Sequence, residues 1–172
     1  MSDQPEFSRP VLLARIGAEP VRREIAANSG EREALARRFG LLALDRLSAN
    51  VELFRRGGDV ILLRAGFEAA FAQECVVTLD PIESTLSGEF ELLYGPPDVE
   101  ETAMGVIGDT VAFEPLAGDA IDIGEAVAQE FSLALPPFPR SPDAEAPAAP
   151  PDAPGPFAEL GRLLARRDDE AG

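Results

Sequence analysis

Apolar and polar residues alternate with a period of two through the middle of this chain. Over residues 47–53, leucine, alanine and valine occupy every second position, and serine, asparagine and glutamate lie between them. The same alternation runs through 67–79, and again after Pro81 through 82–94, which forms one strand or two divided at Gly88. Residues 60–64 are predicted to pair back on the strand before them. Since successive side chains of a strand point to opposite faces, these segments are predicted to be β-strands with one face buried.

Glycine and proline indicate where these strands begin and end. The Gly-Gly pair at 57–58 tolerates the positive φ of tight hairpin turns, so the strands that flank it are predicted to pair antiparallel. Further short strands are predicted over 9–16, 20–27 and 110–114. The first of them carries Pro10, which fits only the start of a strand or the edge of a sheet.

Two segments have the spacing of amphipathic helices. In the first, over about 30–39, Ser29 is the predicted N-cap, with glutamates in the first turn and arginines in the last. In the second, over about 123–134, Asp122 is the predicted N-cap, and Glu125 completes a pattern that resembles a capping box. These helices are predicted to cover one face of the sheet.

The second helix is followed by Leu-Pro-Pro-Phe-Pro at residues 135–139. Pro136 and Pro137 cannot continue a helix, and Phe138 is predicted to cover the core after the chain turns. The alternative is a polyproline segment that binds in a groove of another protein, which requires an exposed and regular Pro-x-x-Pro.

These elements together predict an α+β fold. It consists of a strongly twisted antiparallel sheet of about five to seven strands with the two helices packed on it. One domain is predicted over residues 1–139. Residues 140–155 are mainly alanine, proline and aspartate, so they are predicted to form a disordered linker. Residues 156–172 are predicted to form a short amphipathic helix and tail, which needs a surface to remain folded.

The net charge of −16 is unevenly distributed. Residues 1–64 contain 11 arginines and 9 acidic residues, whereas residues 65–139 contain 15 acidic residues and no cation. An acidic surface of this kind repels phosphate backbones and attracts basic proteins. The other interpretation is that the acidic residues serve only solubility.

The composition restricts the chemistry and the compartment. The chain lacks histidine, which is the commonest proton shuttle at neutral pH and the commonest metal ligand. Its single cysteine cannot form an internal disulfide, which suits a reducing compartment. The N-terminus has neither the basic start nor the apolar run of a signal peptide, and no apolar run in the sequence approaches the length of a membrane span. A soluble, cytoplasmic protein is expected.

No set of residues in the sequence points to catalysis, to a metal or to a cofactor. Cys75 is predicted to be a small core residue on the apolar face of its strand, where nearby acids would raise the pKa of its thiol. Four carboxylates follow nearby, at Asp80, Glu83, Glu89 and Glu91. Their spacing does not match a calcium-binding loop, and it does not indicate the pair of different environments that an acid and a base need. They are therefore predicted to form a solvated strand face. Nucleotide-binding and nucleophile motifs are absent from the sequence.

Three pairs of adjacent arginines are candidates for contact with RNA. They are Arg22 and Arg23, Arg37 and Arg38, and Arg55 and Arg56. Arginine binds phosphate with two parallel hydrogen bonds. However, adjacent residues of a strand point to opposite faces, and aromatic residues are not interleaved with these pairs as in RNA-recognition sheets. Direct RNA contact is therefore expected to be weak.

The order of several features resembles the YceD-like family. A Gly-Gly hairpin precedes Cys75-Val-Val-Thr-Leu-Asp-Pro, an acidic Glu-Leu-Leu-Tyr-Gly-Pro block follows, and the last helix ends in Leu133-Ala-Leu-Pro-Pro-Phe-Pro. This bacterial and plastid family is linked to accumulation of large-subunit ribosomal RNA. Many members have Cys-x-x-Cys where this chain has Cys75 and Thr78. A metal-binding or redox role based on that motif is therefore not expected for this chain, because one thiolate cannot form a structural zinc site.

The resemblance implies a non-enzymatic ribosome-biogenesis factor that supports accumulation or processing of large-subunit (23S) ribosomal RNA. Its expected partner is a basic ribosomal protein or a large-subunit precursor particle, with neither a membrane nor a small-molecule substrate. The predicted partner-binding acids are Glu89, Glu91, Glu100 and Glu101. The alternatives are an acidic binding module for a basic protein unrelated to the ribosome and, more remotely, a metal-assisted hydrolase.

Overall fold

The computed structural model describes residues 5–97, 111–116 and 118–144. Residues 1–141 belong to one unit of the chain, and residues 142–172 belong to a second, of which only 142–144 are described. Most of the predicted linker and the whole of the predicted C-terminal helix therefore lie outside the described residues. Both remain predictions.

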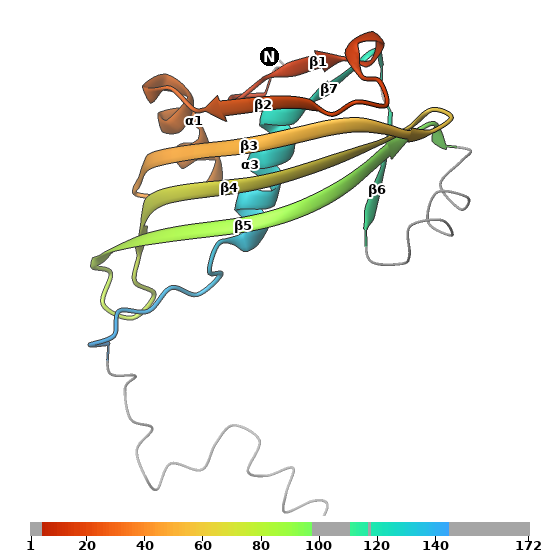
Figure 1. The fold of residues 1–172 in the computed structure, drawn as a ribbon. Helices are drawn as coiled ribbons and strands as arrows, with labels where there is room; N and C mark the ends of the chain where they lie inside the picture. The colour runs from red at the N-terminus through yellow and green to blue at the C-terminus, as the bar shows by residue number, and fades with distance from the viewer. Residues whose placement is uncertain (1–4, 98–110, 117, 145–172) are drawn as a thin grey trace, which may run out of the picture. The chain divides into compact units, whose positions relative to one another are not determined.

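The described part of the first unit contains seven strands and two α-helices, arranged as Figure 1 shows. A single 3₁₀ turn, Leu13–Arg15, follows the first strand. The strands are β1 (Pro10–Leu12), β2 (Val21–Ala26), β3 (Ala43–Gly57), β4 (Val60–Glu74), β5 (Pro81–Gly95), β6 (Ala112–Pro115) and β7 (Ala120–Asp122). The helices are α1 (Ser29–Phe39) and α3 (Ile123–Ala134).

Five strands form the main sheet in the order β2-β3-β4-β5-β6, and β1 pairs with β7 in a separate two-stranded sheet. This confirms the predicted α+β fold. The strands from β2 to β5 pair antiparallel as expected, but β6 runs parallel to β5. The connection between them, residues 96–111, is long enough for the crossover that parallel pairing requires. The alternation of side chains does not encode strand direction, so the sequence could not indicate it.

The β3–β4 hairpin forms where the Gly-Gly pair predicted it. Gly58 has a φ of 55°, a conformation that side chains other than glycine rarely adopt. The hairpin places Leu53 opposite Leu63, and both are buried on the inner face of the sheet. Ser48, Asn50 and Glu52 alternate with the buried residues of β3, as expected for a strand with one solvated face.

Helix α3 crosses the inner face of the sheet (Figure 1). Its Phe131 is fully buried in the hydrophobic core. The Phe131 ring makes edge-to-face contacts with three other rings, those of Phe39, Phe67 and Phe71, at centroid distances of 6.0, 6.2 and 5.6 Å. The Phe67 ring also lies against Gly88 of β5, where a Cβ would approach it to 2.8 Å. Aromatic residues from both helices and from β4 therefore fix the helices to the sheet.

Asp122 joins the start of α3 to the N-terminal segment. Its carboxylate accepts hydrogen bonds from the backbone N–H groups of Gly124 and Glu125, which confirms the predicted N-cap. It also accepts from Ser8 Oγ at 2.5 Å and from Arg9 N at 2.7 Å. One carboxylate thus satisfies the free donors of a helix and holds a segment more than a hundred residues away in the sequence.

Helix α1 begins one residue earlier than predicted. Asn28, not Ser29, is the N-cap, and it forms a complete capping box with Glu31. Asn28 has extended backbone angles, whereas Ser29 is already helical, so only the Asn28 side chain can reach the N–H of Glu31. Glu31 also accepts two hydrogen bonds from Arg9, at 2.8 and 2.9 Å. The hydrogen bonds from Arg9 and from Asn28 N–H lower the pKa of Glu31.

Replacing Glu31 with glutamine is expected to lower stability by on the order of 1 kcal/mol at pH 7, because the charged hydrogen bonds from Arg9 are lost. A carboxyl with a lowered folded-state pKa contributes stability above its unfolded-state pKa and loses it as the pH falls through the folded value. The difference between the two proteins should therefore shrink below about pH 4. Urea unfolding at pH 7 and pH 3 measures it, and a difference that grows in acid would contradict the prediction.

Other features also differ from the predictions. The first strand ends at Leu12, because the chain turns there into the 3₁₀ turn. Strand β4 ends at Glu74, not at Leu79, and Pro81 begins β5 instead of ending β4. Phe138 does not cover the core, since 76% of its surface is exposed.

The position of Phe138 follows from the path of its segment, which continues along the β4–β5 turn. There Pro139 O accepts a hydrogen bond from Val76 N at 3.0 Å.

Neither helix in the described residues is long and apolar enough to cross a membrane.

Candidate functional site

The main sheet has one face that neither α1 nor α3 covers (Figure 1). We call this the outer face. Its residues are polar or charged over most of β2 to β5, and they stand in rows set by the strand register. One row runs across four strands and consists of Arg22, Glu52, Arg64 and Glu91.

Three arginines of the outer face, one on each of β2, β3 and β4, have an acidic partner. Arg22 pairs with Glu52 at 2.6 Å, and Arg64 Nε donates to Glu91. In addition, Arg46 of β3 lies 3.3 Å from Glu68 of β4. Exposed pairs of this kind are individually weak, so they contribute little to stability. Their main effect is to neutralise the cations of this face.

Acidic residues without a cationic partner collect on β5. Glu83, Glu89 and Glu91 alternate along its outer face, and within the described part of the chain only Glu91 has an arginine partner. Of the four predicted partner-binding acids, the structure therefore places Glu89 and Glu91 together on β5. Glu100 and Glu101 lie outside the described residues.

The three arginine pairs are divided between the two ends of the sheet. Arg22 and Arg23 lie on β2 beside the β3–β4 hairpin, which carries Arg55 and Arg56, whereas α1 with Arg37 and Arg38 lies at the other end of β3 (Figure 1). The pairs thus do not form a single cluster. Arg22 and Arg23 point to opposite faces, as expected from their adjacency in a strand.

Three of the six arginines form ion pairs within the fold, namely Arg22, Arg38 and Arg55. Arg38 binds Glu125 of α3 at 2.7 Å and Glu6 at 2.9 Å, and these carboxylates raise the pKa of its guanidinium. Arg55 donates to the backbone oxygens of Leu13 and Ile16. In contrast, Arg56 lies over the Phe54 ring and Arg37 is exposed.

Cys75 lies in the turn between β4 and β5, not on a strand, but it is fully buried as predicted. Its Sγ accepts hydrogen bonds from Ser141 N and Thr78 N, both at 3.4 Å. These bonds, led by that from Ser141, lower the thiol pKa to about 6, which corrects the prediction that nearby acids raise it. Aligned N–H dipoles next to the sulfur outweigh more distant carboxylates because electrostatic interactions weaken with distance. The thiol thereby fastens the chain after α3 to this turn.

A hollow of about 1500 Å³ extends over the outer face toward β5 and its edge. Its lining includes Glu68, Glu89, Glu91 and Phe90, and it reaches Glu130 of α3. Burial and the nearby Glu114 raise the pKa of the Glu130 carboxyl. Tyr94 is buried near the same two glutamates, and burial raises its pKa.

The sequence did not predict that Glu114, Glu130 and Tyr94 would be neighbours. They come from β6, α3 and β5, and no spacing in the sequence relates them. Their proximity depends on β6 joining the sheet beside β5, which the alternation did not predict. Of the three, Glu130 lines the hollow, together with Ala112 of β6.

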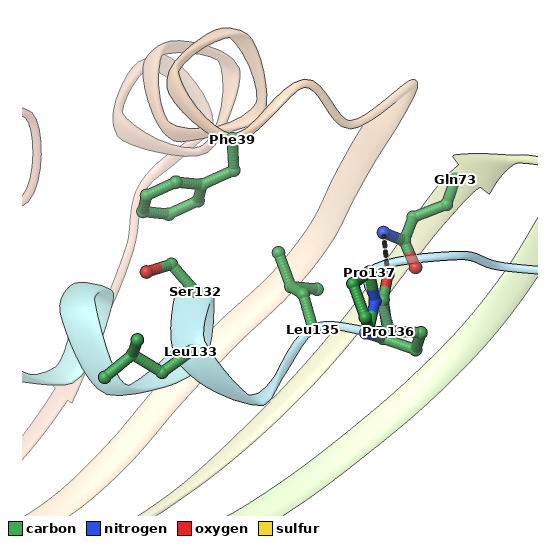
Figure 2. Close-up of a pocket in the computed structure, with 7 residues that line it drawn as sticks. All are labelled: Phe39, Gln73, Ser132, Leu133, Leu135, Pro136 and Pro137. Carbon is green, nitrogen blue, oxygen red and sulfur yellow. Dashed lines mark hydrogen bonds between the residues drawn. The ribbon is translucent and has the colours of Figure 1, made fainter. Parts of the chain in front are cut away.

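A second hollow of about 430 Å³ lies between the ends of α1 and α3. Figure 2 shows Phe39, Leu133 and Leu135 around it, with Gln73 Nε2 donating to Pro136 O at 3.3 Å. No charged residue lines this hollow. Its chemistry therefore differs from that of the acidic hollow at β5.

The described residues contain no group of three or more histidine, cysteine or acidic side chains placed to hold a metal ion.

The profile of the family described as large ribosomal RNA subunit accumulation protein YceD matches residues 63–160. The chain belongs to the YceD family.

The YceD match begins in β4 and includes β5, β6 and α3. It therefore contains the Cys75 turn, the acidic strand β5 and the part of the hollow that β4, β5 and α3 line. No curated protein and no solved structure matches the chain.

Proposed function

We propose that this YceD-family protein supports the accumulation of large-subunit ribosomal RNA as a non-enzymatic assembly factor. It does so by binding a basic ribosomal protein or a large-subunit precursor particle in the bacterial cytoplasm. The observation that carries this proposal is the charge of the outer face. Arg22, Arg46 and Arg64 of β2, β3 and β4 are neutralised by ion pairs, whereas Glu83 and Glu89 on β5 have no cationic partner among the described residues.

This charge distribution favours a protein partner over RNA. Phosphates that approached β5 would meet uncompensated carboxylates, whereas lysine and arginine side chains would be attracted. RNA would then be contacted by arginines that form no ion pair within the described part of the fold, such as Arg37 and Arg56. Because those residues are separated, such contact is secondary to protein binding.

Reversing the charge of Glu83 and Glu89 to lysine is expected to release the protein from large-subunit particles. Tagged full-length protein is followed through a sucrose gradient of cell lysate, and large-subunit ribosomal RNA is quantified in cells that contain only the variant. Association should fall by about tenfold or more, and wild-type association should weaken as salt rises. Reversing Glu91, Glu100 and Glu101 as well extends the test to all of the predicted acids.

The matched control reverses Glu19 and Glu33, which are exposed acids away from β5. It changes the net charge by the same amount, so it separates a local surface from a general charge effect. Equal loss in both variants would contradict a role for β5. Wild-type protein that never migrates with ribosomal particles, in cells whose ribosomal RNA is unaffected by its deletion, would contradict the function itself.

A further inference from the structure

Most of β5 forms an unpaired edge of the main sheet. β5 pairs with β4 along its length without a register shift, whereas β6 pairs only with Leu92–Gly95. In the described part of the chain, no strand lies beside Pro81–Glu91 on the side away from β4. This edge has eleven residues, which corresponds to roughly 35 Å of extended chain.

The direction of the backbone groups on this edge follows from the pairing with β6. Gly95 O accepts a hydrogen bond from Leu116 N on the β6 side. Because the N–H and C=O groups of a strand alternate in direction with each residue, those of every second residue before Gly95 point the same way. The backbone groups of Thr85, Ser87 and Glu89 therefore point out of the sheet.

This edge lacks most of the features that protect sheet edges from pairing. Natural edges are usually short, bulged, or interrupted by proline or lysine. Here the only proline stands at the first position, the pairing with β4 is regular, and there is no cation. Its charges are acidic, so they favour an incoming strand that is basic.

The two faces of the edge also differ. Glu83, Thr85, Ser87, Glu89 and Glu91 are on the outer face, whereas Leu86 and Phe90 are on the inner face and only partly buried against the core. An added strand would therefore lie beside carboxylates on its outer face and beside the apolar side chains of Leu86 and Phe90 on its inner face.

We propose that the β5 edge binds an extended basic segment of a protein as an additional strand of the sheet. The segment carries arginine or lysine at alternate positions, facing the β5 glutamates, and apolar residues between them that pack beside Leu86 and Phe90. Main-chain hydrogen bonds to Thr85, Ser87 and Glu89 supply affinity, and the alternation supplies specificity. Assigning this segment to a ribosomal protein rests on the proposed function.

A second copy of this chain fits the edge poorly. Antiparallel self-pairing centred on Ser87 would place Glu83 opposite Glu91 across the new junction. Like charges directly opposite each other destabilise strand pairing. The acids thus disfavour association of the edge with itself while they attract a basic strand.

The test uses the full-length protein and a fluorescent peptide of about eleven residues that alternates arginine with valine or threonine. Ser87→Pro removes one outward N–H without removing a bond to β4, because proline is tolerated where that N–H faces solvent. This change should weaken peptide binding by roughly tenfold or more, whereas Ser87→Ala, which keeps the N–H, should bind within about twofold of wild type.

A second peptide distinguishes strand addition from simple charge attraction. It is tested on the wild-type protein, so the result does not depend on whether a variant folds. It has the same sequence, with methyl groups on the backbone nitrogens of alternate residues that would face β5. It should fail to bind wild-type protein, and the unmodified peptide should slow hydrogen exchange at the amides of Thr85, Ser87 and Glu89. Equal binding by both peptides, or by Ser87→Pro and wild type, would overturn the proposal.

The same variants distinguish this inference from the proposed function. If wild-type protein migrates with large-subunit particles and Ser87→Pro does so equally, the function stands and the edge is not its binding site. If wild-type protein binds the peptide through β5 but never migrates with the particles, the edge stands and its natural partner lies outside the ribosome.

Discussion

Replacing Gly124 with alanine is expected to destabilise the protein by about 3 kcal/mol or more, although alanine is the better helix former. Gly124 lies in the first turn of α3, directly beneath the N-terminal segment. A Cβ at this position would lie 2.2 Å from the backbone oxygen of Phe7 and 3.1 Å from Arg9 N. Backbone atoms cannot rotate away, so either α3 or the N-terminal segment must shift.

That shift would also disturb Asp122, whose carboxylate bridges the same two segments. The matched control is Gly30→Ala in α1, where a Cβ would make only an ordinary 3.5 Å contact with the Asn28 side chain. It should change stability by between zero and a gain of about 1 kcal/mol. The chain lacks tryptophan, so urea unfolding is best followed by circular dichroism. Similar unfolding midpoints for the two variants would contradict the predicted clash.

Replacing Phe131 with alanine is expected to cost about 3–5 kcal/mol, because the ring is fully buried among three other rings. Small domains are stable by only about 5–15 kcal/mol, so this variant should be partly unfolded under mild conditions. The loss should be largest where α3 meets the sheet. Hydrogen exchange of α3 amides, together with urea unfolding, measures both the size and the location of the effect.

Phe138→Ala provides the control, since it removes the same side chain from an exposed position. It should change stability by less than about 0.5 kcal/mol. Phe131→Leu keeps an apolar group of similar volume and should cost about 1.5 kcal/mol or less. If Phe138→Ala proved as damaging as Phe131→Ala, the assignment of the core around α3 would be wrong.

The packing of the core leaves the edge of β5 available. Both helices cover the inner face, and Phe131 packs α3 against Phe67 and Phe71 of β4. Neither helix covers the outer face (Figure 1), and in the described part of the chain no strand pairs with the first eleven residues of β5 on the side away from β4. In a YceD-family protein, a rigid inner face would hold an acidic strand in place for a basic partner.

The sequence by itself determined the nature and approximate position of most elements. Alternation predicted β3, β4 and β5, because a strand with one solvated face needs an apolar residue at every second position. Asp122 predicted the start of α3, because its side chain caps a helix through local bonds. The YceD-family relationship was also visible in the residues around Cys75 and Pro136.

Only the tertiary structure decided which residues from different elements meet. The parallel direction of β6 and the proximity of Tyr94, Glu114 and Glu130 depend on how a crossover places distant segments. The lowered pKa of Cys75 depends on Ser141, which lies 66 residues away in the sequence. The open edge of β5 exists because β6 pairs only with its last four residues. Local periodicity records which face of a strand is buried, but it contains no information on which strand lies beside it.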